Sequence, residues 1–351
     1  MSRVAVVGAG ITGLVAAWEL AQSGCDVTVL ESERRPGGVI ISERREGFVI
    51  EGGPDGFLAA EPEIPELARE VGLAKQLVGQ SARGTFLWNG AALEPLAEGR
   101  AAALLGIDAG AADVAAGFRS FANGMGELVT TLAERLAGKL QFTQGVTGLA
   151  PTPVGWRVAL TGGSALDSEG VVLALPAYAG GRLLEAVGVS GARALGDVVY
   201  APGVTVSLAY RADQVTRPLD GTGFVSAPGV GVVRACTYAS SKFPGRAPDG
   251  YVLLRAFLEP ADGDSRMLAH GELAAILGIR GAPLWSRAFH WTRGLPRYPA
   301  HHAGRVAAVR ARLRRLAPLA IAGAGFDGTG VSACVRSGRE AARVVLGRLG
   351  G

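Results

Sequence analysis

The sequence predicts an α/β plus α+β protein of two domains, a Rossmann-like domain assembled from discontinuous segments and a second domain built on an antiparallel sheet. Three observations predict this architecture. A strand, a glycine turn and a helix open the chain over residues 3–22, and the same order returns over 317–346. Between 204 and 257, several runs alternate apolar with polar residues, as half-buried antiparallel strands do.

The N-terminal unit begins with a continuous apolar run over residues 3–7, which is typical of a parallel strand buried on both faces. Residues 14–22 have helical spacing, and a second apolar strand over 27–30 ends at Glu31. An acid at this place can accept hydrogen bonds from ribose hydroxyls. Strand, glycine turn, helix, strand and acid in this order predict a dinucleotide site.

Each glycine between the strand and the helix has a mechanical role. Gly8 permits the tight turn, Gly10 lets the backbone approach a pyrophosphate, and Gly13 lets the helix pack closely on the strand. The helix N-terminus adds free amides and a partial positive charge. The residues expected to contact this part of the dinucleotide are Gly8, Gly10, Ile11, Thr12, Gly13, Glu31 and Ser32.

Two further glycine pairs indicate which dinucleotide binds. The chain continues with Arg35, Pro36, Gly37 and Gly38, and later with Gly53 and Pro54. A nicotinamide-only domain has no need of them, whereas an extended FAD lies along the fold, where side chains near its phosphates and ring would clash. Arg35 can place a positive charge close to the pyrophosphate. The alternative is a pair of ordinary Gly-Pro turns. We therefore expect FAD as the cofactor.

The C-terminal unit repeats the pattern. A buried strand over 317–322 runs into the glycine turn 323–331, and the following residues are helical to 346. The bare amides of this helix N-terminus can face the flavin ring or the ribityl chain, or the unit can be a structural crossover without ligand contact. The residues expected at the cofactor are Gly323, Gly330, Val331 and Ser332.

The remaining segments divide between the two domains. We assign residues 1–58, 118–190 and 305–351 to the FAD-binding domain, and residues 59–117 and 191–304 to the substrate-binding domain. Helical spacing predicts helices over 123–136, 265–277 and 304–316. Further strands are expected over 156–160, 170–176 and 286–291.

Composition excludes several classes. Of the 351 residues 48% are hydrophobic, yet no apolar stretch reaches the roughly 18 residues of a membrane-spanning helix. Cys25, Cys236 and Cys334 are too scattered for a disulfide framework or a metal site, so we expect a reducing cytoplasm and no metal. The net charge of +4 suits an acidic ligand or a membrane surface, and equally follows from an arginine-rich composition. We expect no nucleic acid partner.

Taken together, these motifs resemble a known family. The first glycine turn, the Arg35–Gly38 run and the terminal AGAGFDGTGVSACVRSGREAA are similar to the amine-oxidase-like flavoproteins. Residues 118–128, 237–244 and 291–298 resemble segments of the porphyrinogen oxidases, which act on protoporphyrinogen IX or coproporphyrinogen III in heme biosynthesis. The resemblance covers nearly the whole chain.

The resemblance implies a reaction and a set of contacts. Hydride would leave the porphyrinogen for flavin N5, and molecular oxygen would reoxidise the flavin and give peroxide. The backbone of Val146 would meet the adenine end of FAD, and Trp291 would pack near the flavin. No residue is assigned as a catalytic acid or base, and the adjacent His301 and His302 have no assigned proton role. The substrate-binding residues implied are Arg83, Thr85, Val225, Arg234 and Phe257, of which Val225 and Phe257 can equally be core residues and Arg83 and Arg234 surface residues.

Two departures from the family's pattern narrow this expectation. Family members insert a helical, membrane-associating subdomain where this chain has only residues 94–117, so we expect a shortened remnant, weak or absent membrane association and solubility without detergent. Thr85 stands where animal and plant protoporphyrinogen enzymes have an arginine, which favours the bacterial coproporphyrinogen branch. A homodimer is possible. The alternative functions are a flavin amine oxidase or desaturase acting on another apolar substrate, and a non-catalytic protein that binds FAD or a porphyrin.

Overall fold

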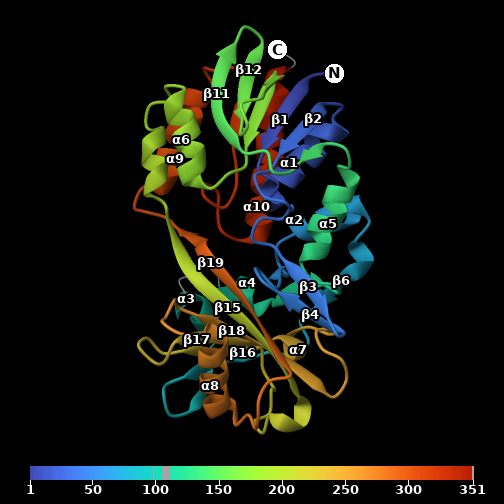
Figure 1. The fold of residues 1–351 in the computed structure, drawn as a ribbon, viewed down its shortest axis with the longest axis vertical. Coiled ribbons are helices and arrows are strands. Elements are labelled where there is room, and N and C mark those ends of the chain that lie inside the picture. The colour runs from blue at the N-terminus through green and yellow to red at the C-terminus, as the bar shows by residue number, and fades with distance from the viewer. Residues whose placement is uncertain (98, 105–110, 350–351) are drawn as a thin grey trace.

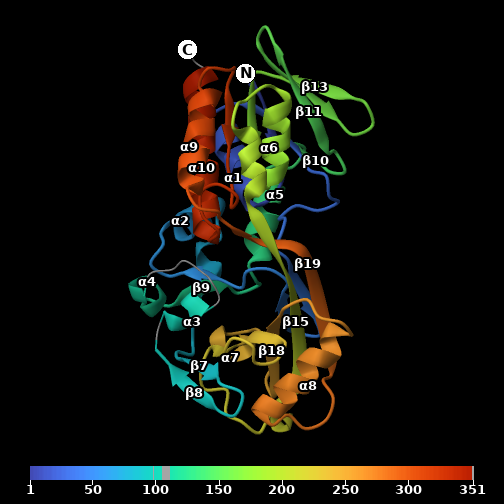
Figure 2. The same ribbon diagram turned by 90° about the vertical axis from the view of Figure 1, so that its left-hand side faces the viewer.

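The computed structural model describes residues 1–97, 99–104 and 111–349. Two domains are stacked along the long axis of the molecule, and the N-terminus and the last described residues lie at the outer end of the first domain (Figures 1 and 2). The predicted α/β plus α+β fold class is confirmed, with one parallel sheet and one largely antiparallel sheet.

The first domain is built on a parallel sheet of order β10-β2-β1-β14-β20. Its strands are β1 (Arg3–Val7), β2 (Asp26–Leu30), β10 (Leu140–Gln141), β14 (Gly170–Leu173) and β20 (Leu319–Ile321). Side chains of the central strand β1 alternate between two cores, with Val4 and Val6 on one face and Ala5 and Val7 on the other. Because both faces are covered, the strand is apolar from Val4 to Val7, after the exposed Arg3.

Different elements cover the two faces. The face of Val4 and Val6 packs against α1 (Ile11–Gln22), α2 (Glu63–Val71), α5 (Gly126–Arg135) and α10 (Val331–Leu349). The other face packs against the antiparallel strands β11 (Val146–Thr152), β12 (Gly155–Leu160) and β13 (Ala165–Ser168), and against α6 (Ala177–Ala186), the 3-10 helix η2 (Ala192–Asp197) and α9 (His302–Leu313).

Helix α2 lies within residues 59–117, which the sequence analysis assigned to the substrate-binding domain, yet it packs into the first domain. Ile64, Leu67, Ala68 and Val71 recur at the i, i+3, i+4, i+7 spacing that places them on one helix face. All four are buried in the same cluster as α1 and α10. Along this segment, the second domain therefore begins after α2.

The second domain is built on a sheet of order β19-β15-β18-β17-β16-β7-β8. Its strands are β7 (Thr85–Trp88), β8 (Leu93–Leu96), β15 (Val199–Arg211), β16 (Gly223–Ser226), β17 (Val233–Tyr238), β18 (Tyr251–Leu258) and β19 (Trp285–Arg297). The strands between 204 and 257 pair antiparallel as expected, whereas β16 pairs in parallel with β7, a strand from outside that range. No hairpin joins these two strands, so no tight turn imposes the antiparallel direction. Helix α8 (Ser265–Leu277) covers one face.

Two long strands connect the domains. β15 and β19 have 13 residues each and pair from one domain into the other (Figure 1). At one end of β15, Tyr200 packs against the core of the first domain, whereas Tyr210 near the other end lies in the core of the second. The sheet of the second domain is therefore continuous with the first domain at this edge.

Short elements lie mainly around the junction. They are β3 (Ser42–Arg45), β4 (Phe48–Glu51), β5 (Phe57–Leu58), β6 (Leu77–Gly79), β9 (Phe118–Phe121), α3 (Arg100–Leu104), α4 (Ala111–Ala115), α7 (Ala239–Lys242), η1 (Ala74–Gln76) and η3 (Ala212–Gln214). The shortened segment 94–117 contributes the end of β8, α3 and α4, while residues 98 and 105–110 lie outside the described residues. Among the described helices, none combines the length and the apolar character required to cross a membrane.

Candidate cofactor and substrate site

The first glycine turn contains two glycines that packing within the protein requires and one that faces open space. Gly8 has a φ of +102°, and a Cβ added there would lie 2.4 Å from the Ala174 carbonyl oxygen. A Cβ on Gly13 would lie 1.9 Å from the Gly8 oxygen, so the helix could not pack on the turn. A Cβ on Gly10 would meet nothing within 4 Å. Gly10 therefore leaves room beside the N-terminus of α1 for a phosphate group.

The second glycine pair lies against the first turn. The Gly37 amide donates to the Ala9 oxygen at 2.8 Å, and Gly10 and Gly37 form a parallel bridge. Both Gly37 and Gly38 have positive φ, and a Cβ on Gly37 would lie 2.8 Å from the Ile40 oxygen. The guanidinium of Arg35 donates to the carbonyls of Pro36 at 3.0 Å and Gly38 at 2.6 Å. These hydrogen bonds stabilise the loop of residues 35–38 and hold the positive charge of Arg35 beside Gly37 and Gly38.

A cavity of about 440 Å³ continues from the first turn towards α6. Glu31 lines it, and its carboxylate accepts hydrogen bonds from the amides of Ala9 at 2.7 Å and Glu33 at 2.9 Å. The buried Oε1 of Gln144, another lining residue, makes no hydrogen bond within the described part of the chain. The lining residues are Val7, Gly8, Leu30, Glu31, Ser32, Gln144, Gly145, Val146, Thr147, Leu175, Ala179, Arg182, Leu183 and Ala186.

Gly8, Glu31, Ser32 and Val146, which the sequence predicts as cofactor contacts, line this cavity, and α6 contributes residues that were not predicted. Ala179, Arg182, Leu183 and Ala186 have the i, i+3, i+4, i+7 spacing of one helix face. An apolar stripe of this kind ordinarily predicts core packing, so the spacing identifies the face without indicating that it borders a cavity. The neighbours of Val146, namely Gln144, Gly145 and Thr147, were also missed, although they adjoin a residue that was predicted.

The C-terminal turn meets the N-terminal turn. A Cβ on Gly323, whose φ is +119°, would lie 3.6 Å from Thr12 Oγ1, and a Cβ on Gly338 would lie 2.4 Å from the Thr12 oxygen. A Cβ on Gly330 would meet nothing within 4 Å, and it stands just before α10. Beside it, Val331 is buried, and the fully buried hydroxyl of Ser332 has no hydrogen-bond partner within the described residues. The two glycine turns therefore share one space.

A stacked aromatic pair supports the C-terminal turn. The Tyr298 hydroxyl donates to the Ala324 oxygen and accepts from the Gly328 amide at 3.1 Å. Burial, the largest cause, raises the pKa of this phenol to about 12. The ring of His302 stacks on it with 4.6 Å between centroids, and burial lowers the pKa of His302. The neighbouring His301 is exposed and starts α9 in the left-handed conformation.

The Gly52–Pro54 loop reaches the second domain. A Cβ on Gly53 would lie 1.8 Å from the Val39 oxygen, so only glycine fits there. The Gly52 carbonyl accepts hydrogen bonds from Thr205 Oγ1 at 3.0 Å, Arg255 Nη2 at 3.2 Å and Trp291 Nε1 at 3.1 Å. These donors come from the three neighbouring strands β15, β18 and β19. The structure therefore brings Trp291 and Gly53 together at the junction of the domains.

Two of the expected substrate residues project from the sheet face that meets this loop. Strand pairing places Thr205 beside Phe257, Phe257 beside Ala235, and Ala235 beside Val225. Paired residues project from the same face of a sheet, and Thr205 points to Gly52. Val225 and Phe257 therefore belong to a row on the face directed at the first domain. Val225 is nevertheless nearly fully buried by its neighbours.

The other three expected substrate residues already have partners. Thr85 Oγ1 lies 2.9 Å from Thr222 Oγ1. Arg234 Nε lies 3.3 Å from a carboxylate oxygen of Glu259, an exposed residue. Arg83 is exposed, and its Nη1 donates to the Ala115 oxygen at 2.7 Å. A substrate carboxylate would have to displace these interactions.

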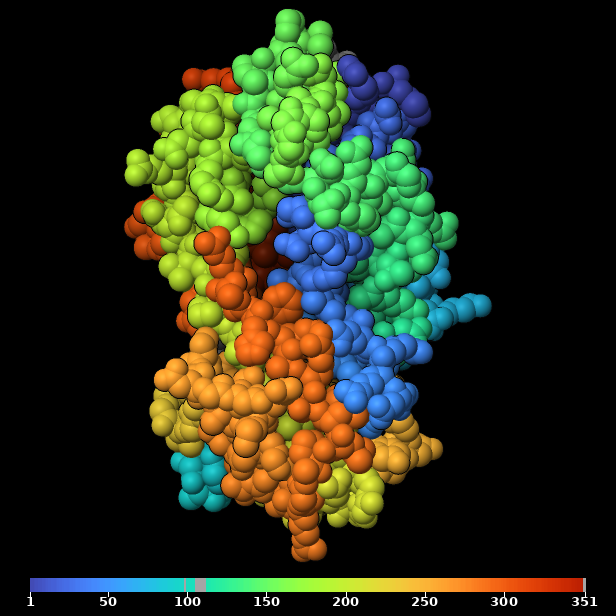
Figure 3. All heavy atoms as spheres, viewed as in Figure 1, coloured from blue at the N-terminus to red at the C-terminus, as the bar shows by residue number. Residues whose placement is uncertain are grey.

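A space-filling view shows a hollow between the domains (Figure 3). It is bordered by the N-terminal part of the chain, by the segment around α6 and by β19, and the C-terminal part of the chain is visible at its base. The N-terminal and C-terminal parts of the chain carry the glycine turns, and the C-terminal part also carries the start of α10. Beside Gly53, Val39 is 47% exposed, so an apolar surface is available for contact.

Comparison with known proteins identifies the family. The family model for flavin-containing amine oxidoreductases matches residues 11–122 and 83–346. The chain belongs to this family. The protein is therefore an FAD-dependent oxidoreductase, as the glycine turns predicted.

Relatives and solved structures agree with this assignment. A coproporphyrinogen III oxidase of Propionibacterium freudenreichii is 25% identical over 98% of this chain and 90% of the relative. A coproporphyrinogen III oxidase of Bacillus subtilis is 24% identical over 97% of each chain. The crystal structure of a candidate protoporphyrinogen oxidase from Exiguobacterium sp. 255-15 has a TM-score of 0.84 at 21% identity, covering 100% of this chain and 99% of the other. The first alignment runs over 484 positions, so that relative has segments that this 351-residue chain lacks.

The residues present fit the FAD of this flavin-containing family. The large cavity, with the unpartnered Gln144 oxygen and Glu31, suits the adenosine end, and the open side of Gly10 suits the phosphates. The surface formed by Val39, Gly53 and the start of α10 is then left to contact the isoalloxazine ring. When bound, FAD supplies the hydride-accepting chemistry, and the protein supplies binding, orientation and electrostatics.

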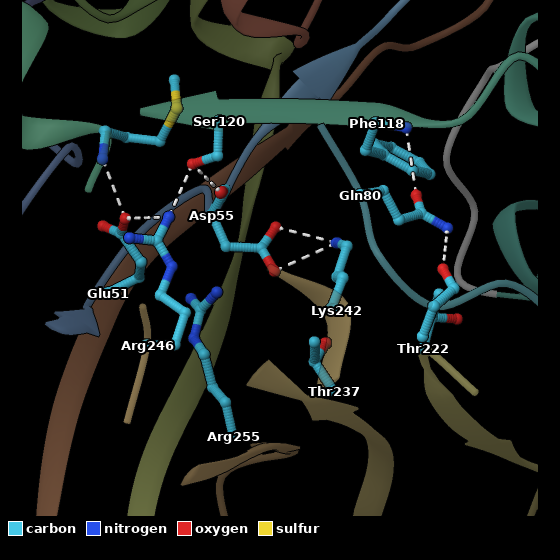
Figure 4. A network of polar contacts seen from close by, with 12 residues as sticks. Glu51, Asp55, Gln80, Phe118, Ser120, Thr222, Thr237, Lys242, Arg246 and Arg255 are labelled. Atoms are coloured by element: carbon cyan, nitrogen blue, oxygen red, sulfur yellow. Dashed lines mark hydrogen bonds and ion pairs between the residues drawn. The ribbon is translucent and has the colours of Figure 1, made fainter. Parts of the chain in front are cut away.

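A charged cluster includes the two residues that flank the Gly52–Pro54 loop of this flavoprotein, Glu51 and Asp55 (Figure 4). It consists of Glu51, Asp55, Lys242, Arg246 and Arg255, of which all but Asp55 are at least nine-tenths buried. Lys242 Nζ lies 3.1 Å from Asp55, and Arg246 Nη2 lies 3.5 Å from Glu51. Burial raises the pKa of Glu51. Burial would also raise the pKa of Asp55, but the nearby cations outweigh it and hold that pKa below its usual value.

Proposed function

We propose that this flavoprotein oxidises a porphyrinogen to the porphyrin in heme biosynthesis, with coproporphyrinogen III as the preferred substrate and protoporphyrinogen IX as the second candidate. The observation that carries the proposal is the extent of the similarity. Relatives named coproporphyrinogen III oxidase align over 97% or more of this chain and at least 90% of their own length. A match of this extent includes the substrate-binding sheet as well as the cofactor turns.

The geometry of the junction supports the proposal. A porphyrinogen presents four pyrrole rings, and the face directed at the Gly52–Pro54 loop offers Phe257 and Val225 in one row. An aromatic ring such as Phe257 can pack against a pyrrole. Arg83 and Arg234 are the proposed partners of substrate carboxylates, each after exchanging its present contact. The protein's own part in the reaction is to hold the macrocycle against the flavin and exclude water, because the redox chemistry belongs to the cofactor.

The residue at position 85 supports the coproporphyrinogen branch. Thr85 lies on β7, and its hydroxyl lies within hydrogen-bond distance of the hydroxyl of Thr222, the residue before β16. A threonine carries no positive charge, so this position offers no ion pair to a propionate.

Molecular oxygen is the proposed electron acceptor, with peroxide as the product. We also propose that the protein is cytoplasmic, that its association with membranes is weak or absent, and that a homodimer is its possible assembly.

The test is aerobic oxidation of coproporphyrinogen III and protoporphyrinogen IX by the purified yellow protein, followed by porphyrin fluorescence. We expect fluorescence to rise faster than autoxidation in the presence of enzyme, and faster with coproporphyrinogen III. Heat-inactivated enzyme with free FAD is the control. A flavin-loaded protein that accelerates neither oxidation would overturn the proposal. Anaerobic addition of substrate then separates the alternatives, because a non-catalytic porphyrin-binding protein leaves the flavin oxidised.

A further inference from the structure

Three donors converge on one carbonyl of the Gly52–Pro54 loop. The Gly52 oxygen accepts from a hydroxyl of Thr205, the guanidinium of Arg255 and the indole of Trp291. Arg255 also donates to the Gly53 oxygen. At the other end of the Gly52–Gly53 peptide plane, the Gly53 amide makes no hydrogen bond within the described residues. Donors on a carbonyl polarise the peptide and strengthen its N–H as a donor.

Arg255 is the cation of the cluster that lacks an ion pair among the described residues. Its side chain is buried, with 3% exposure, and its guanidinium lies 4.6 Å over the ring of Phe257. Lys242 pairs with Asp55, and Arg246 pairs with Glu51. The Nε of Arg255 is buried without a hydrogen-bond partner in the described part of the chain. With two carboxylates against three cations, the cluster holds one uncompensated positive charge.

We propose that Arg255 is a positioning residue that makes the reduced flavin more stable. Arg255 polarises the Gly52–Gly53 peptide. Both lie at the junction of the two domains, between the glycine turns and the row of Val225 and Phe257. A reduced flavin has gained negative charge, so a fixed positive charge in a low-dielectric site favours it over the oxidised form. The inference rests on the FAD cofactor of the family and not on the proposed substrate.

The test compares charge at position 255 in the full-length holoenzyme. Arg255→Met removes the charge, Arg255→Gln keeps hydrogen bonding without charge, and Arg255→Lys keeps the charge. We measure the dissociation constant for sulfite, which forms an anionic flavin adduct, and the midpoint potential of the flavin by dye equilibration. Arg255→Met and Arg255→Gln should raise the sulfite dissociation constant about tenfold or more and lower the potential, about 30 mV per tenfold for two electrons. Arg255→Lys should stay near the wild type.

Two controls separate charge from structure. Thr205→Val removes a neutral donor from the same carbonyl and should change the sulfite dissociation constant far less than Arg255→Met. Asp55→Asn removes a negative charge from the same cluster and should shift the potential upward, so it tests the idea even where the Arg255 variants fail to fold. Equal potentials for Arg255→Met, Arg255→Lys and the wild type, or an unchanged or lowered potential for Asp55→Asn, would overturn the inference. Neither result depends on which substrate the enzyme oxidises.

Discussion

At the scale of single residues, the glycines of the first turn serve two purposes that one motif does not distinguish. Gly13 is required by packing, because a Cβ there would collide with the Gly8 carbonyl. Gly10 has no such neighbour, so the protein alone does not require glycine there. The spacing of the motif could be predicted from the sequence, but the division between packing and ligand contact depends on distances to atoms elsewhere in the fold.

Substitution of these glycines should therefore separate stability from cofactor binding. Gly13→Ala should lower the free energy of unfolding by roughly 1–3 kcal/mol or more, because a backbone carbonyl cannot move aside. Gly10→Ala should cost less than about 1 kcal/mol, because the position is an N-cap with open space beside it. It should nevertheless weaken FAD binding strongly. Urea unfolding of the apoprotein and a flavin titration measure the two effects, and an apoprotein equally destabilised by both would contradict this division.

His302 is expected to make stability depend on pH. Burial lowers its pKa from 6.5 in the folded protein, so the unfolded chain takes up a proton more readily. Stability is therefore retained above pH 6.5 and falls as the pH drops through 6.5 towards the folded-state pKa. Because both ring nitrogens lack partners within the described residues, His302→Phe should keep the stack on Tyr298.

The measurement is urea unfolding between pH 5 and pH 8 for the wild type, His302→Phe and His301→Gln. As the pH falls below 6.5, the wild type should lose unfolding free energy through His302, whereas His302→Phe should not, so the variant should gain stability relative to the wild type. The exposed His301 serves as the matched control and should leave the profile unchanged. Parallel profiles for all three proteins would show that the pKa of His302 is the same in the folded and unfolded states, and would contradict this prediction.

At the scale of elements, strands and helices with a clear hydrophobic period could be predicted from the sequence. Which strand pairs with which, and where a helix packs, could be predicted less well. Helix α8 has the predicted bounds 265–277, and the strand predicted over 170–176 begins at Gly170 but ends at Leu173. The parallel β16–β7 pair and the docking of α2 into the first domain depend on contacts between distant segments, and local periodicity contains no information about them. For the same reason, the cavity-lining face of α6 was not identified.

That face of α6 makes a testable prediction. Ala179→Trp should fill part of the 440 Å³ cavity and raise the FAD dissociation constant at least tenfold, because the adenosine end loses its space. The binding of ADP should weaken in parallel. Glu185→Trp, an exposed change on the same helix away from the cavity, is the control and should bind both ligands normally. Normal FAD affinity in Ala179→Trp would place the adenosine elsewhere.

At the scale of the whole molecule, the proposed cofactor site combines segments from opposite ends of the chain. Thr12 lies close to Gly323 of the C-terminal turn and to Gly338 of α10, so the two ends of the chain meet, as the repeated strand–turn–helix pattern suggested. The charged cluster at the junction could not be predicted in this way. Lys242, Arg246 and Arg255 read individually as surface residues, since charged side chains are almost never fully buried unless paired. Only the fold brings them against Glu51 and Asp55.

Hydrogen–deuterium exchange with two ligands tests this assembly. Beyond the global slowing that any bound ligand causes, ADP should slow exchange around the adenosine cavity, at residues 8–13, 31–32 and 144–147, because it carries no flavin ring. FAD should protect the same amides and, in addition, residues 37–39, the Gly52–Gly53 amides and the turn 323–332, which lie along the path to the second domain. The comparison is made at saturating ligand, where mass action stabilises both complexes globally, so the difference between FAD and ADP isolates the ring. FAD protection confined to the ADP pattern would mean that the flavin ring lies away from the sheet of the second domain, and Trp291 and Gly53 would then have no part in holding it.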